Sequence, residues 1–129
     1  MQSTNNNRRV TAGEEGRKGY ESQLLAGSDD PLTHGGLARV LAVLGRKAEA
    51  EAEAARAIEL AVSPRGVRLG WVLEAVAVAY VRIGDHDRAV DTLERLLTVP
   101  HAITPAWLRI DPNYEDLRGH PRFERLTGG

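Results

Sequence analysis

Apolar residues recur every three or four positions in four segments of the chain, the period of an α-helix that buries one face. In the first segment, Leu37, Leu41 and Leu44 follow an acidic cap and Pro31, a residue suited to the first turn of a helix. The second is rich in Ala and Glu, which favour helix over strand. The pattern predicts helices over residues 32–44, 47–61, 69–83 and 86–99.

Glycines separate the helices within two predicted pairs. Gly45 and Gly84 are 39 residues apart, and each is followed five positions later by an alanine, Ala50 or Ala89. Glycine permits the backbone of a tight turn, and a small residue early in the second helix allows the pair to pack closely. The equal spacing therefore indicates an internal repeat of two helical hairpins.

The two ends of the chain follow different patterns. Residues 1–12 are polar without a helical period, so we expect a flexible N-terminus, followed by a helix over residues 13–26 that carries Tyr20 and Leu24. Near the C-terminus, prolines follow Thr104, Asp111 and His120. Each of these pairs predicts a break in the chain followed by a short helical turn. Apolar side chains between these breaks predict that residues 104–126 fold back on the helices.

The two hairpins resemble tetratricopeptide repeats, which have a period of about 34 residues. Tyr80 matches the usual aromatic residue of the first helix in the second copy, whereas the first copy has Leu41 at that place. One period before Ala54 stands Tyr20, so residues 13–28 resemble the second helix of an earlier repeat. The matching positions are Leu37, Ala38, Gly45, Ala50, Ala54 and Ala57 in one copy and Val76, Ala77, Gly84, Ala89, Leu93 and Leu96 in the other.

This resemblance implies an all-α fold, an array of antiparallel helical hairpins (an α-solenoid) with short C-terminal capping helices. We expect a single domain over residues 13–126. Its expected parts are a half repeat (13–28), two repeats (31–62 and 69–100) and a cap (104–126), with a flexible segment (1–12) before them and a tail (127–129) after them.

A second resemblance concerns the C-terminal segment, residues 106–123, with Trp107, Asp111, Pro112, His120 and Pro121. It is similar to the closing segment of bacterial tetratricopeptide proteins, in many of which the repeats follow a protein kinase, adenylate cyclase or DNA-binding regulatory domain. The resemblance, over residues 29–126, implies an interaction scaffold without its effector domain. The alternative is a separately encoded regulatory or sensing fragment of a kinase-like or transcriptional regulator.

Composition narrows the partner classes. The 17 basic and 18 acidic residues give a net charge of −1, so we expect no nucleic-acid partner. The sequence has neither an apolar run of about 18–20 residues nor the apolar core of a secretory signal, so we expect no membrane partner and a cytoplasmic location. The chain has no cysteine, which excludes disulfides and thiolate chemistry.

The residues that could carry catalysis lack the required spacing. The four histidines (His34, His86, His101, His120) form no HxxxH or HExxH pair. Glu49, Glu51 and Glu53 alternate along a helix and point to different sides. Gly35 and Gly36 lack the Lys and Ser or Thr of a phosphate-binding loop. We therefore expect no catalytic residue, no cofactor and no metal site.

In tetratricopeptide arrays the first helix of each pair lines a concave groove, where a protein or peptide would bind. By that resemblance Arg39 and Arg82 would contact a carboxylate or an extended backbone, and Trp71 would add apolar contact. The competing interpretation is that these are ordinary surface or packing residues. The groove residues expected are Leu32, Arg39 and Val43 from the first copy and Trp71, Glu74, Val78 and Arg82 from the second.

The half repeat predicts a second interaction surface. Without a first helix to pair with, its face with Tyr20 and Leu24, and with it Leu37, would lie open. We therefore expect this face to support a homodimer or to contact a separate partner.

Overall fold

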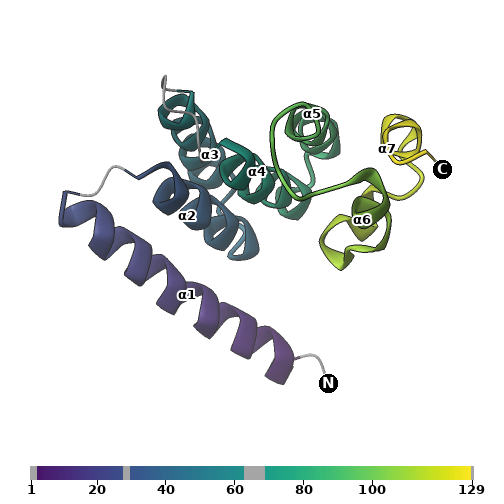
Figure 1. Cartoon of the computed structure of the whole chain (residues 1–129). Coiled ribbons are helices and arrows are strands. Elements are labelled where there is room, and N and C mark those ends of the chain that lie inside the picture. Colours follow the sequence, from purple (N-terminus) through teal and green to yellow (C-terminus); the bar gives the residue numbers. More distant parts are fainter. Residues whose placement is uncertain (1–2, 28–29, 63–68, 129) are drawn as a thin grey trace.

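The computed structural model describes residues 3–27, 30–62 and 69–128, with the backbone alone for residues 3–11. It is an array of stacked helices, which confirms the predicted all-α fold (Figure 1). In Figure 1, α3, α5 and α7 form one row and α2, α4 and α6 the other. The elements are α1 (Ser3–Leu25), α2 (Pro31–Val43), α3 (Lys47–Ala61), α4 (Leu69–Ile83), α5 (His86–Leu96), α6 (Pro105–Ile110), the 3-10 helix η1 (Pro112–Leu117) and α7 (Pro121–Leu126).

Local signals fix the ends of the central helices. The side chains of Asp30 and Asp85 accept hydrogen bonds from the backbone N–H groups of Leu32 and Arg88, at 2.9 and 3.2 Å, and so cap α2 and α5. Residues 28–29, which belong to the acidic cap expected before Pro31, and residues 63–68, between the predicted second and third helices, lie outside the described residues. α5 ends at Leu96, three residues before the predicted end, because the approach to Pro100 disfavours helical backbone.

Small residues let the two hairpins pack closely. Ala38 and Ala77 in the first helices, and Ala50 and Ala89 in the second, are all at most 1% exposed. The packing role predicted for Ala50 and Ala89 is therefore confirmed. α4 is the central helix, because α2, α3, α5 and η1 all pack against it. Most of its residues are buried as a result.

The two predicted glycine turns have the backbone that glycine favours, with φ of +78° at Gly45 and +84° at Gly84. We predict that Gly84→Ala lowers the free energy of unfolding by about 1–2 kcal/mol, because a Cβ is disfavoured in left-handed backbone. Gly19→Ala is the matched control: this glycine lies inside α1 with open space around it, and alanine there should stabilise the helix by up to about 1 kcal/mol. Urea unfolding of both variants measures the change in the free energy of unfolding. A change of the same sign in the two variants would contradict the prediction.

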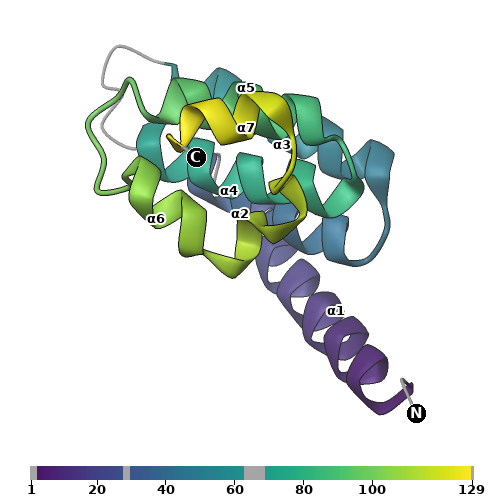
Figure 2. The same ribbon diagram turned by 90° about the vertical axis from the view of Figure 1, so that its right-hand side faces the viewer.

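α1 begins at Ser3, so the predicted start at residue 13 is wrong, and residues 3–12, expected to be flexible, are helical. The sequence has no proline before Pro31 to stop the helix. The first turns of α1 project beyond the other helices (Figure 2), which is why this segment needs no apolar stripe. Hydrophobic periodicity detects only helices that bury a face.

The C-terminal cap consists of three short helical elements, α6, η1 and α7, each with a proline in its first turn. The residue before each proline caps the element through its side chain: Thr104, Asp111 and His120. The predicted short turns are therefore present. Thr127, which the sequence placed in a tail, is 1% exposed and belongs to the cap, because its hydroxyl bonds to the Phe123 carbonyl at 3.0 Å.

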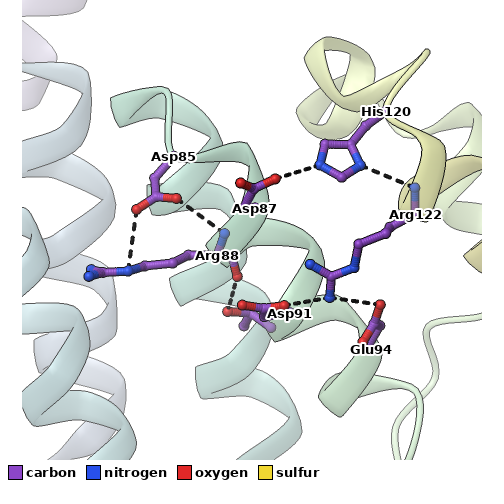
Figure 3. Close-up of polar contacts among 8 residues, drawn as sticks. Asp85, Asp87, Arg88, Asp91, Glu94, His120 and Arg122 are labelled. Carbon is purple, nitrogen blue, oxygen red and sulfur yellow. Dashed lines mark hydrogen bonds and ion pairs between the residues drawn. The ribbon is translucent and has the colours of Figure 1, made fainter.

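Ion pairs connect α7 to α5 (Figure 3). His120 contacts Asp87 through Nε2 at 2.8 Å, while its Nδ1 accepts the backbone N–H of Arg122. The hydrogen bond between His120 and Asp87 holds the pKa of the Asp87 carboxyl below its usual value. The Arg122 guanidinium contacts both Asp91 and Glu94. These pairs are exposed and each contributes little stability, so they orient the cap, whereas its buried apolar residues hold it in place.

Candidate functional site

A hollow of about 730 Å³ lies between α1 and the row formed by α2 and α4. We call it the α1–α4 pocket. Its lining is mostly apolar with a few polar groups, the usual character of a ligand-binding pocket. The lining residues are Ala12, Gly13, Tyr20, Leu32, Gly36, Arg39, Val40, Val43, Trp71, Glu74 and Ala75.

Five of the predicted groove residues line this pocket. Leu32, Arg39 and Val43 come from α2, and Trp71 and Glu74 come from the N-terminal half of α4. Val43 is 47% exposed and Trp71 is 58% exposed, unusually high for large apolar side chains that line a hollow. The structure therefore brings together an apolar surface and a cation on facing parts of two neighbouring helices.

The structure corrects the other two groove residues. Val78 is 3% exposed, so it is a core residue. Arg82 does not line the pocket; its guanidinium donates to the Asn113 side chain of η1 at 3.1 Å. Both residues share a face of α4 with Glu74, but η1 packs on the C-terminal half of that face. The cap therefore closes the groove along the second half of α4.

His101, which the sequence analysis did not connect to the site, positions the α4 side of the pocket. Its Nε2 lies 3.0 Å from a carboxylate oxygen of Glu74, and its ring stands perpendicular to that of Trp71 with centroids 4.8 Å apart. Gly70 makes room for it, because a Cβ there would lie 2.7 Å from Nδ1 of His101. The sequence feature that could have indicated this contact is Gly70, directly before Trp71.

Arg39 is the cation of the pocket, and it is exposed. Within the described part of the chain it forms no hydrogen bond or ion pair. The pKa of Tyr114 in η1 is raised, chiefly by burial. The negative charge of Glu74 adds to this rise, and the positive charge of Arg39 opposes it. The Arg39 guanidinium is therefore available to a ligand, while the Glu74 carboxylate is bonded to His101.

α1 forms the remaining wall, packed antiparallel on α2 through close contacts. Gly13 and Gly16 lie against Leu44 and Val40, and the Tyr20 ring lies over Gly36. Gln23 accepts a hydrogen bond from Thr33 at 3.1 Å, which extends the same register. Glycine on one helix faces a large side chain on the other, so the helices approach closely despite the polar sequence of α1.

This arrangement changes the picture of the face expected to self-associate. Tyr20 and Leu24 are partly buried and pack against the core, and Leu37, expected to lie open, is 3% exposed. α2 supplies the partner that the half repeat was expected to lack. Self-association through Tyr20 and Leu24 stays a prediction, and only the parts of these side chains that α2 leaves uncovered are open to a second copy.

Because Tyr20 contacts Gly36, the effect of Gly36→Ala on stability should change sign when Tyr20 is removed. A Cβ on Gly36 would lie 2.4 Å from the Tyr20 ring, so Gly36→Ala should destabilise the protein. The strain of overpacking, about 1–3 kcal/mol, outweighs the helix-propensity gain of about 1 kcal/mol. In a Tyr20→Ala background only the gain remains, so Gly36→Ala should stabilise. Urea unfolding of the four proteins tests this, and the same sign in both backgrounds would refute the packing.

Other site types find no support in the described residues. In residues 3–27, 30–62 and 69–128 there is no group of three or more His, Asp or Glu side chains placed to bind a metal ion. No helix in this part of the chain is long and apolar enough to cross a membrane.

Comparison with models of known protein families gives a match over the central helices. The family model described as tetratricopeptide repeat matches residues 29–99, which is more than half of the chain and includes α2 to α5. Neither a curated protein nor a solved structure matches the chain.

Proposed function

Because the chain belongs to the tetratricopeptide repeat family, whose repeats generally mediate protein–protein interaction, we propose that it binds a segment of a partner protein in the α1–α4 pocket. The chain then acts as a non-catalytic interaction module and needs no cofactor. The proposal concerns which surface is used and what it contacts.

The exposed Trp71 is the observation that carries the proposal. Tryptophan is enriched among the residues that dominate binding energy at interfaces, especially in hollows where water is excluded on binding. Here the ring is 58% exposed in a pocket that is also lined by Val43 and the cation Arg39. A bound segment of the partner protein would cover this apolar surface, which the fold leaves in contact with water.

Phage-displayed random peptides, selected on the full chain, test the proposal. Peptides that the wild-type chain enriches should lose at least tenfold in affinity on Trp71→Ala. Trp107→Ala is the matched control, because Trp107 is 50% exposed on α6 and does not line the pocket. If no peptide is enriched, or if both variants weaken binding equally, the pocket is not the binding surface.

A further inference from the structure

Resting on the proposed function, we infer that the partner segment is a short extended stretch in which an Asp or Glu side chain lies close to an aliphatic or aromatic residue. The carboxylate pairs with Arg39, and the apolar residue packs on Trp71. The pairing is specific to this chain because it depends on which of the pocket's charges are already used.

The charge of the ligand follows from the polar groups of the pocket. Its lining holds two charged side chains, Arg39 and Glu74. Glu74 is bonded to His101 at 3.0 Å, whereas Arg39 has no partner among the described residues. A guanidinium presents parallel N–H donors that match a carboxylate with two hydrogen bonds. An acidic group is therefore the complement that the pocket lacks.

The apolar half of the ligand follows from the surface next to this cation. The His101 ring, which is held by Glu74, packs perpendicular to Trp71 and restricts its side chain. This restriction reduces the side-chain entropy that is lost when a ligand covers Trp71. Val43 and Leu32 extend the apolar surface along α2. An aliphatic or aromatic side chain buries more of this surface than a small or polar one.

The walls of the pocket favour an extended segment over a helix. A helix with its side chains is about 10 Å wide. α1 bounds one side of the pocket and is held on α2 by the close contacts of Gly13 with Leu44 and of Gly16 with Val40. A few residues of extended chain fit this space without displacing α1.

The position of Arg39 distinguishes an internal acidic side chain from a free C-terminus. Leu32 and Val43 lie on either side of it along α2, roughly 10 Å and 6 Å away at the helical rise per residue. A segment that follows α2 and covers both apolar residues must continue past Arg39 in both directions. The carboxylate that meets the guanidinium therefore belongs to a side chain within the segment.

A charge-reversal selection tests the inference. Short random peptides with blocked C-termini are selected in parallel on the wild-type chain, Arg39→Glu, Trp71→Ala and the control Arg125→Glu, whose site is exposed on α7 outside the pocket. Wild type and Arg125→Glu should enrich peptides with Asp or Glu near an apolar residue. Arg39→Glu should enrich Lys or Arg there instead and bind the wild-type peptides at least tenfold more weakly. Circular dichroism confirms that each variant is folded.

The outcomes separate the inference from the proposed function. Peptides that depend on Trp71 but carry no acidic residue, or whose binding is unchanged in Arg39→Glu, overturn the inference and leave the pocket as the binding surface. The same library is also selected with free C-termini, and enrichment from that library alone overturns the inference as well. Both proposals are overturned if the enriched peptides bind Trp71→Ala and Arg39→Glu with the wild-type affinity, or if neither library yields enriched peptides.

Discussion

Replacing Phe123 by alanine should lower the free energy of unfolding by about 3–5 kcal/mol, the range for truncating a buried aromatic residue. Phe123 is 1% exposed and anchors α7, which packs against α5. Its loss leaves a cavity under a six-residue helix that has few other buried contacts. Denaturant unfolding followed by circular dichroism measures the change.

Two substitutions on the same helix serve as controls for Phe123. Arg122→Ala removes the contacts to Asp91 and Glu94 and should cost at most about 1 kcal/mol, because those pairs are exposed. Arg125→Ala, at an exposed position, should change stability by less than about 0.5 kcal/mol. A larger loss from Arg122→Ala than from Phe123→Ala would show that ion pairs, and not apolar burial, hold the cap on the array.

Ala54→Leu should destabilise the protein by about 1–3 kcal/mol, because Ala54 is 0% exposed where α3 packs on its neighbours. The added carbons require α3 to move away from α2 and α4. The next residue is the matched control: Ala55 is exposed, and Ala55→Leu should leave stability nearly unchanged. If both variants unfold at the same denaturant concentration as wild type, the close helix contact is wrong.

The central hairpins could be predicted from sequence because local signals and periodicity agree there. The predicted ranges 47–61 and 69–83 coincide with α3 and α4. Gly45 and Gly84 mark turns that require positive φ, and Asp85, directly before the predicted start of the fourth helix, caps α5. At these positions the backbone conformation and the residue type depend on neighbours in the sequence, so tertiary context adds little.

The start of α1 could not be predicted, because hydrophobic periodicity detects only helical segments that bury an apolar face. Its first turns extend past the array, and their polar sequence has no apolar period, so it resembles that of a loop. The contacts that hold the rest of α1 use Gly13, Gly16 and Gly36, residues that count against a helix when each is judged alone. Their role appears only when the two helices are placed together.

The pocket was predictable on one helix and only partly on the other. On α2, the resemblance to tetratricopeptide repeats singled out Leu32, Arg39 and Val43, and all three line the α1–α4 pocket. On α4 the same reasoning failed for Val78, since η1 covers that half of the helix and no local pattern shows where the cap folds back. The contact of His101 with Glu74 joins residues from different elements for the same reason.

The fluorescence of Trp71 tests the central claim most directly. The chain has two tryptophans, so Trp107→Phe leaves Trp71 as the only one, and Trp71→Phe leaves Trp107. A peptide enriched by the wild-type chain, chosen without Trp, is titrated into each variant. The account predicts a saturable change in the emission of Trp71, whose exposed ring becomes covered, and no change in that of Trp107. A saturable change from Trp107 with none from Trp71 would place binding on the cap and contradict the account.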